Sequence, residues 1–206
     1  MNEWETLLKD YRHRMPALIL DTKWFVTRDE DDPDGRELPL PDKAYLRYLI
    51  GQYELHPRIL IPKSRQLLLT WSWAAYGLAF CLTRKHVLVI YQTKREEDSI
   101  GFMNRVHFLY RHLPPEIQRC RPANLENSSK LELPKQDARF WGIPQGPDII
   151  RSNTVSLFFS DEVNFQPNAR ASVRAAMPSL GKNGRGIWGS SANAGGLMID
   201  LIEANW

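Results

Sequence analysis

Residues 154–162 read TVSLFFSDE, an apolar run that ends in the adjacent carboxylates of Asp161 and Glu162. The run has the length and composition of a buried strand over residues 154–160. A strand in a parallel sheet delivers its carboxyl end to the crevice in which ligands bind, so both acids are expected there. An aspartate can hold the water shell of Mg²⁺, and a neighbouring glutamate can orient the water that attacks a γ-phosphate. A strand followed by a helix-capping acid gives the same pattern, so the pair alone leaves both interpretations open.

Strands and helices alternate on both sides of this run. Periodicity predicts further strands at residues 58–62, 86–92, 138–143 and 186–189, and helices at residues 42–55, 70–82, 94–112, 168–177 and 197–204. The helix over 70–82 is apolar nearly all round, which predicts burial. Strands interleaved with helices indicate an α/β fold, with a mostly parallel sheet covered by helices on both faces.

The first 40 residues differ from the rest. Residues 1–15 place apolar side chains at helical spacing before Pro16, which predicts a short amphipathic helix that packs on the core. Residues 28–41 (RDEDDPDGRELPLP) are acidic, contain Pro and Gly and lack apolar periodicity, which predicts a loop. We therefore expect a helical arm and loop over residues 1–40 and one core domain over residues 41–206.

Composition excludes several classes of protein. The chain has 206 residues, 43% of them hydrophobic and 25% charged, which suits one substantial core. A net charge of +3 means that any contact with DNA must come from local basic patches. Two cysteines, Cys81 and Cys120, make no disulfide framework or local metal site. No apolar stretch approaches the roughly 18 residues of a membrane span, so we expect a soluble intracellular protein without a membrane partner.

Residues 62–71 (PKSRQLLLTW) join a predicted strand to the apolar helix. Backbone N–H groups at a helix start, together with Lys63 and Arg65, can cradle a phosphate, and Thr70 can bind Mg²⁺. The standard pattern G-x-x-x-x-G-K-[ST] is absent, because the segment contains no glycine and Leu69 stands where the lysine would be. By itself the segment is also typical of a basic turn.

In their joint order these segments resemble the large subunits of phage terminases. The junction is similar to the deviant phosphate loop of that family, in which an early lysine or arginine replaces the late lysine; Lys63 and Arg65 match those positions and Thr70 matches the terminal hydroxyl. The runs HVLVIYQTKREEDSIGFMNRVHFLYRHLP and WGIPQGPDIIRSNTVSLFFSDEVNF follow in the family's order, so the resemblance covers roughly residues 40–200. Leu68 departs from the family, because a glycine normally provides a turn with φ > 0 there. We expect either a more open loop or weakened nucleotide affinity.

The resemblance implies a P-loop NTPase of the ASCE type (additional strand, catalytic glutamate) that hydrolyses ATP with Mg²⁺. It assigns the metal to Thr70 and Asp161 and the attacking water to Glu162. In the family an arginine upstream of the acids acts on the nucleotide of the neighbouring subunit, and Arg151 matches that position; a solvated turn arginine is the alternative. Phosphate contacts are assigned to the loop residues Lys63, Ser64, Arg65, Gln66, Leu67, Leu68, Leu69 and Thr70.

Two further assignments follow from the resemblance. Residues 189–193 (GSSAN) are similar to the family's coupling motif, in which Ser190, Ser191 and Asn193 would sense the γ-phosphate, although the composition is also that of an ordinary loop. Tyr48 and Gln52 are the nearest candidates for the contacts that the family makes with adenine.

The implied function is ATP-driven translocation of double-stranded DNA into a procapsid, in the cytoplasm of the host cell. The implied partners are the portal protein, the small terminase subunit and copies of the chain itself in a ring. Few residues follow Asn193, so we expect the family's C-terminal nuclease domain to be absent. Two alternatives stay open: a helicase-like DNA-dependent ATPase, and a nucleotide-binding relative whose degenerate phosphate loop no longer hydrolyses.

Overall fold

Six strands form one twisted sheet in the computed structural model, which describes residues 3–28, 32, 34–64, 67–191 and 196–203. The sheet order is β3-β8-β7-β4-β6-β5, and every neighbouring pair is parallel except β5 with β6. This confirms the mostly parallel α/β sheet. The strands are β3 (Arg58–Pro62), β4 (Val87–Thr93), β5 (Lys130–Leu133), β6 (Ala138–Pro144), β7 (Val155–Asp161) and β8 (Leu180–Ser190).

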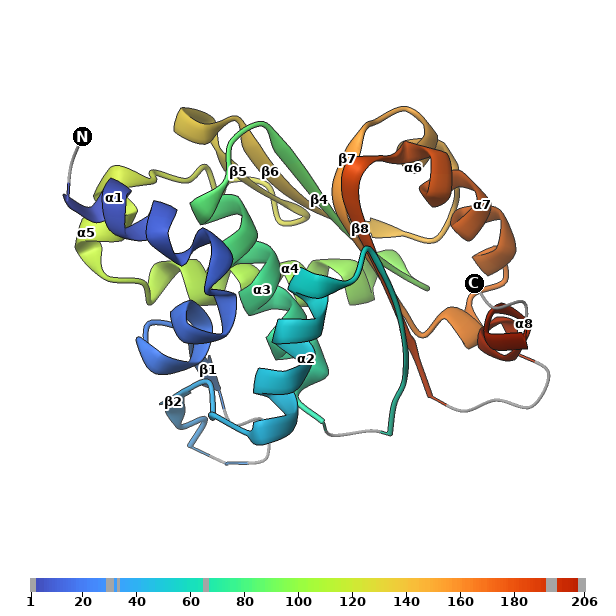
Figure 1. The fold of residues 1–206 in the computed structure, drawn as a ribbon, viewed down its shortest axis with the longest axis horizontal. Coiled ribbons are helices and arrows are strands. Elements are labelled where there is room, and N and C mark those ends of the chain that lie inside the picture. Colours follow the sequence, from blue (N-terminus) through green and yellow to red (C-terminus); the bar gives the residue numbers. More distant parts are fainter. Residues whose placement is uncertain (1–2, 29–31, 33, 65–66, 192–195, 204–206) are drawn as a thin grey trace.

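Helices cover both faces of this sheet, as Figure 1 shows. One face carries α2 (Ala44–Leu55), α3 (Leu69–Thr83) and α4 (Glu96–Arg111), together with α1 (Glu3–Asp10) and α5 (Pro115–Cys120). The other face carries α6 (Asp148–Arg151), α7 (Ala169–Ser179) and α8 (Leu197–Glu203). Short turns complete the chain: η1 (Tyr11–His13), η3 (Pro134–Gln136) and η4 (Val163–Phe165) are 3-10 turns, and η2 (Ala17–Asp21) is a π turn. Every residue of α3 except Thr70 is buried, as its apolar sequence predicts.

The position of β8 matters most for the site. Gly189 of β8 pairs with Ile61 of β3 on one side and with Asp161 of β7 on the other. An extra strand therefore separates the strand that precedes the phosphate loop from the strand that ends in the acids. This is the arrangement expected of the additional-strand class.

Parts of the polar segments fold in ways that the sequence did not predict. The predicted loop over 28–41 is wrong at its ends, because β1 (Val26–Arg28) and β2 (Glu37–Pro39) form an antiparallel pair. All three residues of β2 are exposed, so no apolar alternation marks the strand. α5, β5 and α6 were also not predicted, and β8 begins six residues earlier than the expected 186–189.

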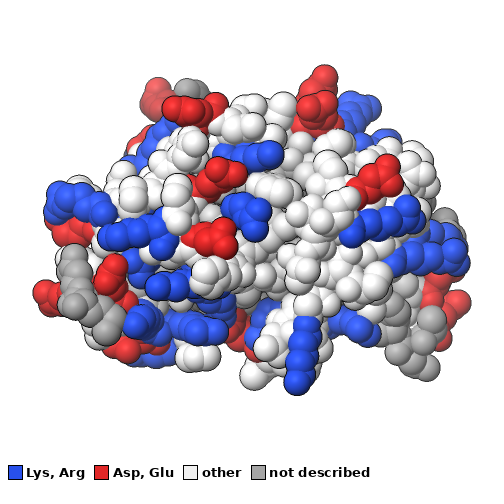
Figure 2. All heavy atoms as spheres, turned by 90° about the horizontal axis from the view of Figure 1, so that it is seen from above, with Lys and Arg blue, Asp and Glu red and all other residues white. Residues whose placement is uncertain are grey.

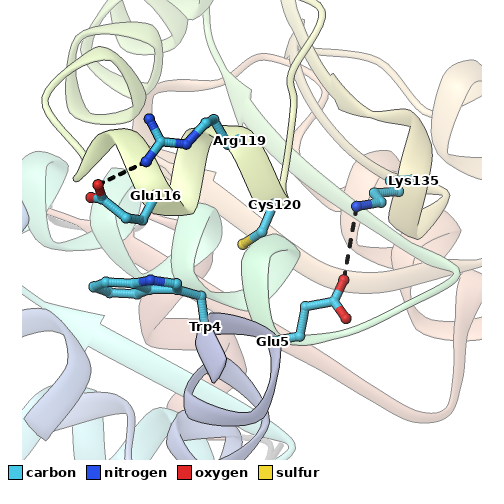
Figure 3. Close-up of a pocket in the computed structure, with 6 residues that line it drawn as sticks. All are labelled: Trp4, Glu5, Glu116, Arg119, Cys120 and Lys135. Atoms are coloured by element: carbon cyan, nitrogen blue, oxygen red, sulfur yellow. Dashed lines mark hydrogen bonds and ion pairs between the residues drawn. The ribbon is translucent and has the colours of Figure 1, made fainter. Parts of the chain in front are cut away.

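The N-terminal segment packs into the main core. Leu8, Met15, Leu18 and Phe25 are buried in the same cluster as the side chains of α3, and Leu40 joins them. Figure 3 shows a recess between α1 and α5, lined by Trp4, Glu5, Glu116, Arg119, Cys120 and Lys135. The boundary at residue 40 stays a prediction, but the arm and the core share one hydrophobic cluster.

Charge is spread over the molecule. In the view of Figure 2, lysine and arginine side chains alternate with acidic ones and form no continuous basic face. Within the described part of the chain, no helix combines the length and the apolar character needed to cross a membrane.

Candidate active site

The end of β8 brings two distant segments together. Pro62 pairs with Ser190, and the backbone N–H of Lys63 donates to the Ser190 carbonyl at 3.0 Å. Asp161 closes β7 on the other side of β8. Neighbouring strands lie about 4.8 Å apart, so a lysine side chain can cross the intervening strand.

Lys63 makes that crossing. Its Nζ lies 2.8 Å from Asp161 Oδ1 and 3.2 Å from Glu162 Oε1. The side chains of Lys63 and Asp161 are only 11% and 8% exposed, whereas that of Glu162 is 36% exposed. Burial alone would lower the pKa of Lys63, but attraction and hydrogen bonding to Asp161, followed by Glu162, outweigh it and raise the pKa. The lysine is therefore a cation held between two carboxylates.

Asp161 is fixed by several groups of the fold. The Tyr91 hydroxyl donates to Oδ2 at 3.0 Å, and the Glu162 N–H donates to Oδ1 at 2.8 Å. Gln166 Nε2 holds the Asp161 carbonyl at 2.6 Å. Burial, and then the charge of Asp161, raise the pKa of Tyr91 well above its usual value, so the phenol remains a donor. Tyr91 was missed in the sequence; the available signal was its place near the carboxyl end of an apolar strand.

Glu162 is held at both carboxylate oxygens. Oε1 faces Lys63, while Oε2 accepts from Ser191 Oγ at 3.0 Å, from Ser191 N at 3.4 Å and from Ser190 Oγ at 3.5 Å. Burial favours a higher pKa for Glu162, but Lys63 and Ser191 outweigh it, so the pKa is lowered and the group is a carboxylate at neutral pH. Its backbone lies in the left-handed region, with φ 52° and ψ 43°. Such strain in a non-glycine residue is common at functional sites.

The loop before α3 makes its turn without glycine. Leu68 has φ 52° and ψ 17°, so the leucine itself adopts the left-handed conformation expected of a glycine. Its carbonyl accepts from Ser72 N at 2.9 Å, which starts the helix, and the Leu67 carbonyl accepts from the Tyr45 hydroxyl at 3.2 Å. The tight turn is thus formed, contrary to the more open loop expected as one alternative; the effect on nucleotide affinity stays a prediction.

Comparison of the sequence with protein-family models and with curated proteins finds no match. The structure is similar to the large terminase of bacteriophage HK97, with a TM-score of 0.69 and 13% identity over 94% of this chain and 42% of that chain. The large terminase ATPase domain of Thermus phage P74-26 has a TM-score of 0.57 and 14% identity over 70% of this chain and 63% of that one. For the large terminase of a further thermophilic bacteriophage, the values are 0.53 and 10% over 73% and 39%. The chain has the fold of phage large terminases. It spans less than two thirds of the length of each of these three proteins.

Other loop residues of the terminase fold lie as follows. Ser64 and Leu67 are exposed, Leu69 is buried at the start of α3, and Thr70 is half-buried in the next position of that helix. Arg65 and Gln66, which were predicted to contact phosphates, lie outside the described residues, as does Asn193 of the coupling motif. The structure thus describes Lys63 and the helix start but not the middle of the loop.

Arg151 lies away from this chain's own acids. It is exposed in α6, where its nearest carboxylate is Asp148 at 3.7 Å. Figure 1 shows α6 and the start of α3 at opposite ends of the sheet. Action on a neighbouring subunit stays a prediction.

The adenine candidates lie on α2. Tyr48 is 65% exposed and Gln52 is half-buried. Tyr45, one turn before Tyr48, contacts the loop directly through the Leu67 carbonyl. Since residues three and four apart share a helix face, Tyr45, Tyr48 and Gln52 lie along one side of α2.

Asn164 extends the network around Glu162 and was also missed. Its Nδ2 donates to the Ser191 carbonyl at 2.9 Å, and its Oδ1 accepts from Met198 N, the second residue of α8, at 2.9 Å. Its backbone N–H donates to Ser190 Oγ at 3.2 Å. The amide therefore joins the two serines to α8.

Proposed function

We propose that this chain is the ATPase motor domain of a viral terminase large subunit, which hydrolyses ATP to drive double-stranded DNA into a procapsid. One observation carries the proposal: Lys63 after β3 lies within 3.2 Å of both acids at the end of β7, across the inserted strand β8. The terminase fold supports the same conclusion independently of the site.

The side chains fit a metal-bound triphosphate. Mg²⁺ prefers hard oxygen ligands, which the Asp161 carboxylate and the Thr70 hydroxyl offer, and it neutralises phosphate charge when bound. No cluster of three or more His, Cys, Asp or Glu side chains suited to a metal occurs among the described residues, which agrees with a metal held mainly by phosphates and water. Lys63 and Arg65 would hold phosphates in this scheme.

Hydrolysis requires a base-like group near the terminal phosphate. Glu162 is ionised, partly exposed and oriented by Ser190 and Ser191, so it can orient and polarise the attacking water. Lys63 must move from the carboxylates toward the phosphates as the metal-bound nucleotide enters. Arg151 of a neighbouring copy would stabilise charge on the phosphoryl group.

The decisive experiment measures ATP turnover of the wild type and of Glu162→Gln, with Glu126→Gln as an exposed control. Loss of the group that orients water is expected to lower turnover by about 10²- to 10⁴-fold without abolishing ATP binding. Measurements over a range of protein concentrations reveal whether Arg151 of a second copy is needed. Equal turnover in the wild type and Glu162→Gln would eliminate the proposal.

Double-stranded DNA, the portal protein, the small terminase subunit and further copies in a ring are the proposed partners. Packaging motors move duplex DNA without separating its strands, whereas a helicase-like ATPase separates them. A strand-displacement assay with a labelled duplex and ATP distinguishes the two. Strand release that depends on Glu162 would favour the helicase.

A further inference from the structure

A second recess lies at the edge of the sheet opposite the acids. It has a volume of about 560 Å³ and includes Pro57 before β3, Val87 at the start of β4 and Val155 at the start of β7. The strands run in parallel from this edge to the edge that carries Lys63 and Asp161. The two sites are thus separated by the length of the central strands.

One wall of the recess is an irregular turn within β8. Leu180 pairs with Val155 and Arg185 pairs with Leu157, so residues 181–184 bulge between two adjacent pairing positions. A Cβ on Gly184 would lie 2.9 Å from the Gly181 nitrogen and 3.0 Å from its oxygen, so the bulge closes tightly on itself. Bulges re-aim side chains, and this one presents Lys182 at the recess.

Basic side chains outnumber acidic ones in this lining. The cations are Arg12, Arg84, Lys182 and Arg185, and the single carboxylate is Glu54. Glu54 is already engaged, because its oxygens accept from Arg84 at 3.1 Å and from the Tyr76 hydroxyl. Within the described chain, Arg12 and Lys182 have no ion-pair partner.

The two inner arginines are held in place by the fold. Arg185 Nη1 donates to the Tyr53 carbonyl at 2.9 Å, and Arg84 Nη2 donates to the Arg12 carbonyl at 3.2 Å. Burial lowers the pKa of Arg84, Glu54 opposes this shift, and the positive charges of Arg12 and Arg185 add to it. The cations therefore repel one another, and an anion between them would relieve that repulsion.

We propose that this recess binds a phosphate group, as a second anion site at the opposite edge of the sheet from the proposed ATP site. Guanidinium groups match phosphate oxygens in bidentate geometry, and a fixed arginine loses little side-chain entropy on binding. The Thr154 and Ser156 hydroxyls, which also line the recess, add neutral donors. The phosphate belongs either to a nucleic-acid backbone or to a free polyphosphate.

The test replaces two exposed cations that hold nothing else in place. The double variant Arg12→Gln/Lys182→Gln is compared with Arg174→Gln/Lys23→Gln, which removes the same charge from positions outside the recess. Binding of a fluorescent 20-base-pair duplex is measured by anisotropy over a range of salt concentrations. Binding of inorganic pyrophosphate is measured by calorimetry, where a site at the ATP edge is common to all three proteins.

For a nucleic-acid backbone, the recess variant binds the duplex about tenfold more weakly than the control, and the slope of log K against log salt falls by about 1.8. For a free polyphosphate, duplex binding is equal in both variants and the recess variant loses one pyrophosphate site. Equal duplex binding together with equal pyrophosphate stoichiometry overturns the proposal. ATP turnover without DNA stays at the wild-type rate in both variants, so failure here is distinguishable from failure of the ATPase proposal.

Discussion

The two edges of the sheet handle positive charge in opposite ways. At the carboxyl edge, Lys63 lies between Asp161 and Glu162, so its charge is matched within the chain. At the amino edge, four cations share one carboxylate, Glu54, which is already paired. Strand β8 reaches both edges, with Arg185 near its start and Ser190 at its end.

This difference predicts how each edge responds to change. A matched, buried ion pair stabilises the fold and must exchange partners when a ligand enters, so losing one member leaves an uncompensated charge. Crowded cations gain from a partner that comes from outside, so losing one of them costs little and relieves repulsion. The predictions below test this contrast in order of expected size.

Lys63→Ala should have the largest effect. The variant leaves the buried carboxylate of Asp161 without its ammonium, which is expected to cost about 3 kcal/mol or more of unfolding free energy and to abolish ATP binding. Urea unfolding and nucleotide titration measure the two losses. Lys182→Gln at the other edge is the matched comparison and should unfold within about 0.5 kcal/mol of the wild type. Equal midpoints for the two variants would contradict the contrast between the edges.

Gly189→Ala should disturb the carboxyl edge through packing. A Cβ at Gly189 would lie 2.5 Å from the Trp73 ring, which stacks on Phe159 with centroids 5.4 Å apart. Overpacking of this kind costs about 1–3 kcal/mol. Gly51→Ala is the control, because a Cβ at Gly51 in α2 meets nothing within 4 Å and alanine favours a helix. A stabilised Gly51→Ala and a destabilised Gly189→Ala are expected in thermal unfolding; similar shifts of the same sign would show that Trp73 yields easily.

Strong apolar runs allowed the sheet to be predicted. β3 has the predicted bounds, and β4, β6 and β7 lie within one residue of theirs, because their burial leaves a direct trace in composition. The acids were found for the same reason, since Asp161 ends such a strand. β2 and the first residues of β8 were missed, because exposed or glycine-rich strands have no apolar alternation.

The contacts within the site were harder to predict. Lys63 was predicted beside the acids only because β3 and β7 share an edge and the segment resembles a known loop. Tyr91 and Asn164 act through tertiary hydrogen bonds to Asp161, Ser191 and α8, which no local spacing encodes. Leu68 shows the opposite problem: the residue type argued against a left-handed turn, yet the backbone adopts one.

That turn at Leu68 gives a third prediction, of about 1 kcal/mol, from the strain of a left-handed non-glycine residue. Leu68→Ala and Leu68→Gly both remove a side chain that packs on the core, but only glycine relieves the positive φ of 52°. Leu68→Gly should therefore be more stable than Leu68→Ala. At Leu67, where φ is not positive, the order should reverse, because glycine loses more backbone entropy on folding. Chemical denaturation of the four variants measures both differences, and an unchanged order at residue 68 would argue against the left-handed turn.

The smallest effect concerns acid stability. The pKa of Glu162 is lowered from 4.5, so its contribution to stability is fully present above that value and is lost as pH falls through the folded pKa. Unfolding free energy of the wild type should therefore fall more steeply below about pH 4.5 than that of Glu162→Gln, which cannot titrate. Because Glu162 is partly exposed, solvent screening keeps the difference small. Glu126→Gln, an exposed replacement away from the site, should follow the wild-type curve. Parallel curves for all three proteins would mean that Lys63 pairs mainly with Asp161, which would leave Glu162 free to face an attacking water.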